Sequence, residues 1–230
     1  MSNLPKIKLF CDTGNLEELK KYAIDKRFTG FTTNPSLIAK EIGDKNYIDT
    51  IKEILQVIPV LPVSFEVVSD EYEEMLRQAK LLASLGDNVY VKIPVVNPDG
   101  TSNVELVNTL TRQKIKVNLT CVASLGQLMK LVDNDGLIIS VFAGRIFDTL
   151  QDAQEICSKI KKFFPRSEIL WASMRELYNI KQAADCGCDI ITVPTSYISK
   201  FNWFDYSLDD VSRLSSEQFL GDAKKAGLEL

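Results

Sequence analysis

The sequence predicts a single (β/α)8 barrel, and three observations lead to that fold class. Eight short apolar runs of strand character alternate with longer amphipathic runs. Eight parallel strands close a barrel, and 230 residues approach the roughly 250 that such a domain typically takes. An open doubly wound sheet would carry a Gly-rich phosphate loop after its first strand, and Asp12-Thr13-Gly14-Asn15 is not such a loop. We therefore expect one barrel domain over residues 1–230, with residues 215–230 as an extra C-terminal helix.

Each expected element follows from the period of its apolar residues, which is two in strands and 3.6 in helices. The expected strands are Ile7–Thr13, Phe28–Asn34, Pro62–Val68, Val89–Val95, Lys116–Val122, Leu137–Ala143, Glu168–Met174 and Asp189–Pro194. The expected helices include Leu16–Ile24, Asp70–Leu85, Asn103–Arg112, Ser124–Val132, Thr149–Phe164 and Met174–Cys186. Strands that alternate with helices in this way form a parallel sheet.

The last helix is expected to begin at Ser215 or Ser216 as N-cap and to stop at Gly227. Its apolar stripe consists of Phe219, Leu220 and Ala223, and an aromatic group precedes it at Trp203, Phe204 and Tyr206. Two placements are open for this helix. It either folds back over its own barrel or packs on a second copy of the chain.

Composition limits the partners and the chemistry. A net charge of −4 argues against a nucleic acid or an anionic membrane as partner, and no apolar run approaches the roughly 20 residues that span a bilayer. The start, Met-Ser-Asn-Leu-Pro-Lys, has no signal-peptide core, so we expect a cytoplasmic protein. The chain has no histidine, which excludes Ser-His and Cys-His nucleophiles and His-ligated zinc. We expect no cofactor and no metal.

The five cysteines, Cys11, Cys121, Cys157, Cys186 and Cys188, are odd in number and scattered. They therefore predict no disulfide framework. Cys186-Gly-Cys188 is a weak signal for a metal site because its spacing is short and no partner ligands are evident. We expect these cysteines to act as small buried hydrophobic residues.

Strand parity places a set of polar side chains inside the barrel. In the fourth strand the aliphatic residues Val89, Val91, Ile93 and Val95 should face the helices, which turns Lys92 inward. The same test sends Asp12, Glu66, Asn118, Thr120, Ser140, Phe142 and Ser173 inward. It turns Cys121 outward in the fifth strand, and Leu170 and Ala172 outward in the seventh. Most of the inward residues lie near the C-terminal ends of their strands, where barrel enzymes place their active sites.

Each of these residues alone has an ordinary structural interpretation. Asp12 alone would pass for a helix N-cap, and Glu66 for an ion-pair partner. Together, however, they would bury an ammonium group and two carboxylates at several kcal/mol each. A functional site explains that cost better than a structural role does.

The inward set suits carbonyl chemistry by imine formation. A lysine amine in a dry interior is a nucleophile for a ketone, and the protonated imine draws electrons from a neighbouring C–C bond. Asp12 and Glu66 are the interior carboxylates available for proton transfer. Arg145 after the sixth strand, with Ser173 and Arg175 after the seventh, forms a candidate clamp for a phosphate or similar anion. The alternative is that each arginine pairs with a surface carboxylate such as Asp148 or Glu176.

A family resemblance rests on motifs that follow one another along nearly the whole chain. They are Phe10-Cys11-Asp12-Thr13, Gly30-Phe31-Thr32-Thr33-Asn34-Pro35-Ser36-Leu37, Phe65-Glu66-Val67, Val91-Lys92-Ile93-Pro94, Asn118-Leu119-Thr120, Ser140-Val141-Phe142-Ala143-Gly144-Arg145-Ile146 and Ala172-Ser173-Met174-Arg175. The chain resembles the transaldolases, and most of all the short subfamily that also contains fructose-6-phosphate aldolase.

The resemblance implies a role for each matching residue. Lys92 matches the Schiff-base lysine, and Asp12 the acid/base for the C4 hydroxyl of the sugar. Glu66 and Thr120 match the pair that positions the catalytic water. The remaining matches are substrate-binding: Asn34, Asn118, Ser140 and Phe142 around the sugar, and Arg145, Ser173 and Arg175 at the phosphate. The substrates it implies are sugar phosphates, and a C-terminal helix packed on a neighbouring subunit implies a homo-oligomer.

Two positions separate the activities within the family. The aldolase carries Gln and Tyr where this chain has Glu66 and Phe142, so the resemblance favours transfer of a dihydroxyacetone unit from a ketose phosphate to an aldose phosphate. Val141 and Ala143 depart from the usual Pro and Val, and the run Val122-Ala123-Ser124 also differs. The alternatives are therefore an aldolase, a transaldolase of sulfofructose and, outside enzymes, a non-catalytic barrel that binds sugar phosphates.

Overall fold

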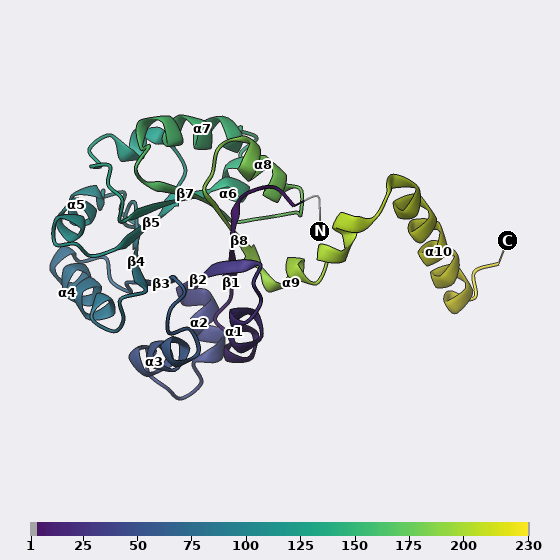
Figure 1. The fold of residues 1–230 in the computed structure, drawn as a ribbon, viewed down its shortest axis with the longest axis horizontal. Coiled ribbons are helices and arrows are strands. Elements are labelled where there is room, and N and C mark those ends of the chain that lie inside the picture. Colours follow the sequence, from purple (N-terminus) through teal and green to yellow (C-terminus); the bar gives the residue numbers. More distant parts are fainter. Residues whose placement is uncertain (1–3, 230) are drawn as a thin grey trace.

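Eight parallel strands form a closed barrel in chain order in the computed structural model, which describes residues 4–229. The helices surround the strands on the outside (Figure 1). The strands are β1 Lys8–Asp12, β2 Phe28–Thr32, β3 Val63–Glu66, β4 Val89–Pro94, β5 Val117–Val122, β6 Leu137–Phe142, β7 Glu168–Ala172 and β8 Ile190–Pro194. The predicted (β/α)8 fold class is confirmed, and all eight expected strands are present.

The register of neighbouring strands sets polar residues side by side. Lys92 on β4 lies opposite Glu66 on β3 and opposite Asn118 on β5. Asp12 on β1 lies opposite Thr32 on β2. Because of this register, neighbouring strands end at about the same height, and side chains that are far apart in the sequence lie together at one end of the barrel.

Several helices of the barrel are amphipathic, and some of them start at a side chain that caps their first turn. The helices of the barrel are α1 Leu16–Ala23, α2 Pro35–Glu41, α3 Tyr47–Val57, α4 Tyr72–Ala83, α5 Val104–Arg112, α6 Ala143–Phe147, α7 Ala153–Phe163, α8 Asn179–Asp185 and α9 Thr195–Ile198. The side chains of Asn15, Asn46 and Asp152 accept hydrogen bonds from backbone N–H groups in the first turns of α1, α3 and α7. On α7 the buried residues Ala153, Cys157 and Ile160 repeat at helical spacing and face the strands.

Two apolar layers hold the barrel together. The larger one lies between strands and helices and contains the outward residues Val89, Val91, Ile93 and Val95, as strand parity predicts. The smaller one fills the interior and consists of Phe10, Ile138, Leu170, Ala172 and Ile190. Gly30 leaves room for the Phe10 ring, because a Cβ at Gly30 would lie 2.5 Å from ring atoms. The inner layer therefore fills the barrel beneath the polar residues.

Two expectations for helices were wrong. The segment Ser124–Val132 forms only the short 3-10 turn η1, Leu125–Leu128, with reciprocal hydrogen bonds between Ser124 and Gln127 at its start. A glycine at position 126 weakens any longer helix there. The last expected helix of the barrel begins at Asn179 and not at Met174. The helices α2 and α3 were not among those expected, and Asn34 is the N-cap of α2 and not part of β2.

The C-terminal helix α10 spans Leu208–Ala226, so the expected start at Ser215 or Ser216 was wrong. Ser207 is the N-cap, in a reciprocal pair with Asp210, while the hydroxyl of Ser215 bonds within the helix to the Val211 carbonyl at 2.8 Å. Gly227 ends the helix in the left-handed conformation, as predicted.

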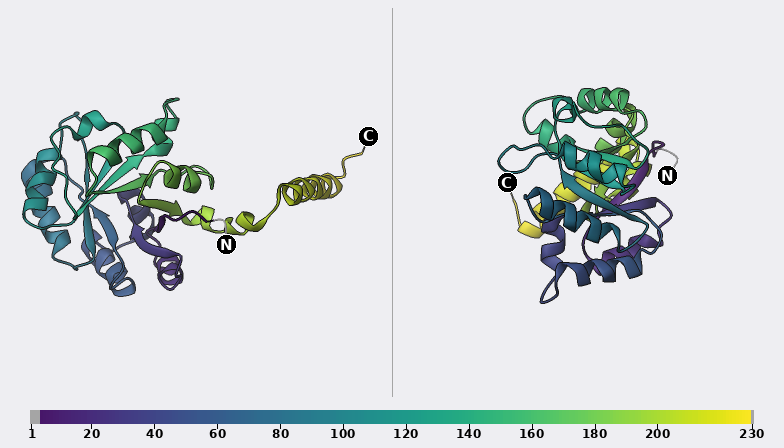
Figure 2. Two further views of the ribbon diagram at one scale, coloured as in Figure 1. Left: turned by 45° about the horizontal axis from the view of Figure 1, so that its top comes forward. Right: turned by 90° about the vertical axis from the view of Figure 1, so that its left-hand side faces the viewer.

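Helix α10 projects away from the barrel (Figures 1 and 2). None of its described residues is buried, and Phe219 and Leu220 are 69% and 58% exposed. The placement in which it folds back over its own barrel is therefore wrong for this structure. Of the aromatic group before it, Trp203 and Phe204 belong to the 3-10 turn η2, Phe201–Asp205, and Tyr206 follows that turn. Phe204 packs on Phe201 at the barrel edge.

Candidate active site

A cavity of about 460 Å³ opens at the C-terminal ends of the strands. Nine of the residues expected at the site line it: Asp12, Asn34, Glu66, Lys92, Thr120, Ser140, Phe142, Arg145 and Ser173. Asn118 and Arg175 are the two expected residues that do not line it. Sequence reasoning missed seven further lining residues, which are Thr32, Pro35, Ser36, Cys121, Leu170, Ala172 and Thr192.

Lys92 reaches the cavity from β4 between the outward-facing Val91 and Ile93. Its side chain is 8% exposed, and its ammonium donates to the Thr33 carbonyl at 2.8 Å. The Nζ atom lies 3.2 Å from Oε2 of Glu66. The amine is thus fixed at two points, and a carboxylate lies within proton-transfer reach of it.

Asp12 is held by a short chain of hydroxyl groups. The Thr32 hydroxyl donates to Oδ1 of Asp12 at 2.7 Å, and the Thr192 hydroxyl lies 2.5 Å from that of Thr32. Because Thr32 has a single proton to give, its oxygen is the acceptor for Thr192 in this arrangement. Strand alternation could have predicted that Thr192 faces the barrel interior, since its neighbours Ile191 and Val193 both face the outer core.

The electrostatics of Asp12 combine one dominant effect with two opposing ones. Burial raises the pKa of the Asp12 carboxyl, while the hydrogen bond from Thr32 and the charge of Lys92 lower it. The net pKa lies above the ordinary value for aspartate. A carboxylate in such a site accepts a proton more readily than an exposed one does.

Asn118 lies fully buried beneath the cavity. Its amide donates to the Ser64 hydroxyl at 3.1 Å, and its carbonyl oxygen accepts from the Ser140 hydroxyl at 2.6 Å. Thr120, two residues further along β5, has a buried hydroxyl with no hydrogen-bond partner among the residues that the structure describes. Buried polar groups are usually paired, so a free hydroxyl beside a cavity suits a bound molecule or water.

The parity prediction failed at the ends of β5 and β7. Cys121 was expected to face outward, but it lines the cavity and Val122 takes the outward position in the core. Leu170 and Ala172 were also expected outward, but they belong to the inner layer, while Trp171 faces the outer core. At Cys121 the reason is a register shift between Leu119 and Val122 with a positive φ of 62°.

Ser173 still reaches the cavity, although the strand parity behind that expectation was wrong. It follows the last residue of β7 and has a φ of 61°, which reverses the direction of its side chain. Positive φ at a residue other than glycine is uncommon, and it occurs here at two residues that line the same cavity.

The expected anion clamp is only partly assembled. Arg145 on α6 lines the cavity, whereas Arg175 forms an ion pair with Asp148 at 2.9 Å, which is the alternative that the sequence left open. Gly144 makes this layout feasible, because a Cβ there would lie 1.9 Å from the Ser173 carbonyl oxygen and 2.9 Å from the Arg175 side chain. The backbone segments after β6 and β7 therefore touch directly.

Asn34 caps a helix and also lines the cavity. Its Oδ1 accepts the Leu37 N–H at 2.9 Å and so caps α2. The amide nitrogen of the same side chain is not used by this cap, and the residue lines the cavity. It can therefore donate to a ligand without uncapping the helix.

Fold and site together define a (β/α)8 barrel with one buried lysine among carboxylates, hydroxyls and amides at the C-terminal mouth. A model of the transaldolase/fructose-6-phosphate aldolase family matches residues 9–228. The chain belongs to this family, and it is an enzyme of the transaldolase/aldolase type.

Two relatives with similar sequences cover the same length. A probable transaldolase of Nitrosopumilus maritimus (strain SCM1) is 35% identical over 228 residues, covering 97% of each chain. A probable transaldolase of Thermoanaerobacter sp. (strain X514) is 34% identical over 228 residues, covering 97% of this chain and all of the relative.

Solved structures extend the likeness at the level of the fold. A putative lyase/mutase from Burkholderia cenocepacia J2315 has a TM-score of 0.59 at 13% identity, over 97% of this chain and 86% of the other. A thiamine phosphate pyrophosphorylase from Pyrococcus furiosus has a TM-score of 0.52 at 15% identity, over 83% and 87% of the two chains. Within residues 4–229, each helix is too short or too polar to cross a lipid bilayer.

Proposed function

We propose that this enzyme transfers a dihydroxyacetone unit from a ketose phosphate to an aldose phosphate through a Schiff base on Lys92. The supporting observation is the setting of the Lys92 amine, which is buried at the cavity floor, anchored to the Thr33 carbonyl and 3.2 Å from Glu66. Donors of the right class are fructose 6-phosphate and sedoheptulose 7-phosphate.

Formation of the imine uses Lys92 and Glu66. The neutral amine adds to C2 of the ketose, and the C2 oxygen takes up protons and leaves as water. Glu66 receives the proton lost by the amine and returns it to the C2 oxygen, and a second proton taken up from solvent completes the departing water and leaves the imine protonated. We assign to Thr120 the task of holding the water, because its buried hydroxyl has no partner among the described residues.

Cleavage uses Asp12. Its carboxylate takes the proton of the C4 hydroxyl, which becomes an aldehyde as the C3–C4 bond breaks. The electron pair of that bond moves into the protonated imine and leaves an enamine on Lys92, and the aldose phosphate departs. The enamine carbon then attacks the acceptor aldehyde, Asp12 returns its proton to the new hydroxyl, and water releases the product ketose. The raised pKa of Asp12 suits a group that both takes and returns a proton.

Substrate contacts are assigned to the amides and the anion clamp. Asn34, Asn118 and Ser140 would hold the dihydroxyacetone part, with Asn118 oriented by its two serine partners. Arg145 and Ser173 would bind the terminal anion, and Arg175 would exchange Asp148 for it when the substrate enters. The same clamp suits a sulfonate, so sulfofructose is a second candidate donor.

Covalent trapping tests the mechanism. Borohydride added with fructose 6-phosphate should reduce the imine and add the mass of the trapped unit to the peptide that contains Lys92. The Lys92→Met variant should stay folded, by circular dichroism, and lose turnover and trapping. An adduct on another lysine, or none in the wild-type enzyme, would reject the mechanism, and the absence of trapping would favour a barrel that only binds sugar phosphates.

A second experiment separates transfer from simple cleavage. The family description also covers fructose-6-phosphate aldolase, which is the competing activity. A transaldolase should turn over a ketose phosphate donor only when an acceptor aldose phosphate is present. Steady release of free dihydroxyacetone from the donor alone would assign the aldolase activity. Running phosphorylated and sulfonated donors side by side then identifies the substrate class.

A further inference from the structure

Three thiols converge on the outer side of the barrel, at the end opposite the catalytic cavity. The Sγ atoms of Cys157, Cys186 and Cys188 all lie within 4.8 Å of one another. Cys157 comes from the middle of α7, and the other two flank the turn between α8 and β8. Cys157 is fully buried and Cys186 and Cys188 are each 7% exposed, so the cluster lies within the outer core, close to its surface.

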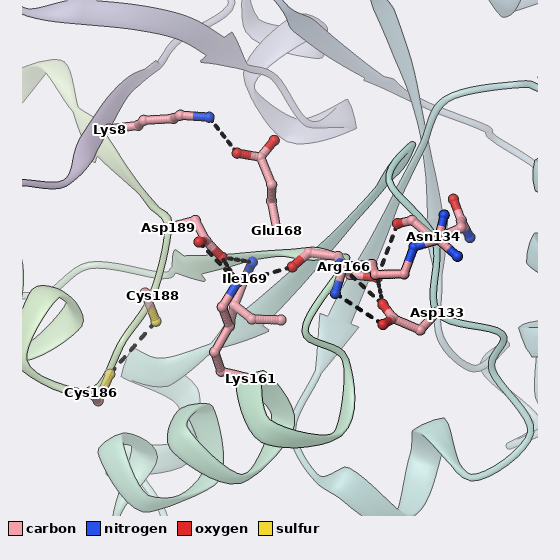
Figure 3. Close-up of polar contacts among 11 residues, drawn as sticks. Lys8, Asp133, Asn134, Lys161, Arg166, Glu168, Ile169, Cys186, Cys188 and Asp189 are labelled. Carbon is pink, nitrogen blue, oxygen red and sulfur yellow. Dashed lines mark hydrogen bonds and ion pairs between the residues drawn. The ribbon is translucent and has the colours of Figure 1, made fainter.

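The backbone of the turn explains why two of these sulfurs meet. Gly187 has a φ of 84° and ends α8, with its N–H bonded to the Ala184 carbonyl and the Cys188 N–H bonded to the Ala183 carbonyl. This reversal directs the side chains of Cys186 and Cys188 to the same side, with their sulfurs 3.6 Å apart (Figure 3). A residue with a Cβ at position 187 would strain that turn.

The spacing fits the geometry of a metal–thiolate site. Metal–sulfur bonds of about 2.3 Å in a tetrahedral site hold the sulfurs roughly 3.8 Å apart, close to the observed Cys186–Cys188 distance. Small rotations of side chains that already lie within 4.8 Å complete the set. Thiolates select soft ions over Mg²⁺ or Ca²⁺.

We propose that Cys157, Cys186 and Cys188 form a binding site for one thiophilic d10 metal ion, Cu(I) or Zn²⁺. Three thiolates satisfy Cu(I), whereas Zn²⁺ would take a water molecule as its fourth ligand, next to Cys186 and Cys188, which keep 7% of their surface exposed. Each metal–sulfur bond that forms replaces one S–H bond, and three protons pass to the buffer. The thiol of Cys186, which contacts the Ala183 carbonyl at 3.3 Å, loses no essential bond, because that carbonyl keeps the Cys188 N–H at 2.9 Å.

A cation lies beside the cluster. Lys161, one turn after Cys157 on α7, covers the turn so closely that a Cβ on Gly187 would lie 3.9 Å from its Cγ. Its ammonium forms an ion pair with Asp189 at 2.8 Å, next to Cys188 (Figure 3). Asp189 balances this positive charge, so the pair adds no net charge next to a thiolate–metal cluster. Because α7 and the α8–β8 turn both supply ligands, the bound ion would fasten them together and stabilise the fold.

The first experiment uses the reduced, metal-free full-length protein under nitrogen. Zn²⁺ and Cu(I) are each titrated against a chromophoric chelator, and Co²⁺ is added as a spectroscopic stand-in for Zn²⁺. One ion per chain, an intense sulfur-to-cobalt charge-transfer band and a rise in Tm of about 5–10 °C at a free metal concentration near 100 times Kd are expected. The arm with the tighter Kd identifies the ion. No charge-transfer band together with no stoichiometric binding of Zn²⁺ or Cu(I) would overturn the proposal.

Matched variants locate the site. Cys157→Val keeps an apolar side chain in a buried position, and it should lower the affinity by at least about 100-fold. Cys188→Ser should do the same. Cys11→Ala removes another fully buried thiol outside the cluster and should leave stoichiometry and Kd unchanged. Unchanged affinity in Cys157→Val, or an equal loss in Cys11→Ala, would contradict the proposal, and the wild-type cobalt band remains decisive if a variant fails to fold.

Discussion

At the scale of single residues, the interior lysine depends on groups that hold it and its partners in place. Lys92 is anchored by a main-chain carbonyl and faces Glu66, while Asp12 is connected through Thr32 to Thr192. Threonine hydroxyls that fix a carboxylate also set how easily it ionises. Thr32 and Thr192 are therefore candidates for positioning residues, although they are not part of the proposed covalent chemistry.

The pH profile tests the contact between Thr32 and Asp12. Thr32→Val removes the hydroxyl and keeps the shape, and the lost hydrogen bond should raise the pKa of Asp12 further. In the proposed mechanism Asp12 must be ionised to take the C4 proton, so activity should be lost below its pKa and the acid limb of kcat/KM should move to higher pH. On that limb kcat/KM should fall about 10-fold or more, since a hydrogen bond to a charged group contributes about 1.5–3 kcal/mol.

Thr29→Val is the matched control for this test, because Thr29 lies on the same strand but is exposed. It should leave the profile unchanged. A Thr32→Val enzyme whose acid limb does not move would show that the hydrogen bond has no influence on the essential ionisation.

The anion clamp is tested by Arg145→Ala. Arg145 lines the cavity and is proposed to bind the terminal anion, so its loss should raise KM for phosphorylated donors and lower kcat/KM by about 10- to 150-fold. Arg175→Ala should act in the same direction, and Arg166→Ala, at a surface pair with Asp135, is the control. An equal fall in kcat/KM with phosphorylated and unphosphorylated ketoses would show that these arginines do not bind the terminal anion.

At the scale of elements, the ends of β5 and β7 depart from regular strand geometry at the cavity mouth. Cys121 and Ser173 both adopt positive φ, and each turns a side chain into the cavity that strand alternation alone would not place there. Between them, Gly144 at the start of α6 allows the Ser173 carbonyl to approach the backbone closely. Local strain of this kind is kept where a site requires it.

Gly144→Ala tests the close approach between α6 and the end of β7. The new methyl group would lie 1.9 Å from the Ser173 carbonyl oxygen, so backbone must move and the free energy of unfolding should fall by about 1–3 kcal/mol or more. Urea unfolding measures this loss, and kcat/KM should fall as well because Ser173 and Arg145 shift. Gly221→Ala is the control: nothing lies within 4 Å of its Cβ on α10, and alanine there should stabilise the helix by up to about 1 kcal/mol. Equal stability of Gly144→Ala and wild type would contradict the close approach.

At the scale of the whole molecule, α10 is the helix that does not pack on its own barrel. It extends from the barrel with Phe219 and Leu220 exposed, and such a helix gains stability by packing its apolar face against another surface. We propose that it packs on a neighbouring copy of the chain in a homo-oligomer, as the resemblance to the short transaldolases implies.

Removal of residues 208–230 tests this assembly by light scattering. The full-length protein should be an oligomer at micromolar concentration, and the truncated protein should have a smaller oligomeric mass. Replacing Phe219 and Leu220 by Asp should have the same effect, whereas Lys225→Asp, on the opposite face by helical spacing, should not. A full-length protein that is already monomeric would reject the proposal.

The sequence by itself determined the barrel and most of the residues at its mouth. Alternation along Val89–Val95 is enough to turn Lys92 inward, because aliphatic residues on every second position must face the helix layer. Gly227 as a helix stop also follows from local chemistry, since glycine adopts positive φ without a steric penalty. These features depend on neighbours in the chain, so a single sequence contains them.

Only the tertiary structure decided the features that depend on contacts between distant segments. The bulge at Cys121 and the positive φ at Ser173 break the inward–outward alternation of their strands, and no local sequence pattern predicts them. The meeting of Cys157 with Cys186 and Cys188 requires α7 to pack beside the α8–β8 turn. The pairing of Arg175 with Asp148 likewise depends on the close approach at Gly144. Local periodicity fixes which face a side chain takes, whereas long-range packing fixes which other side chain it meets.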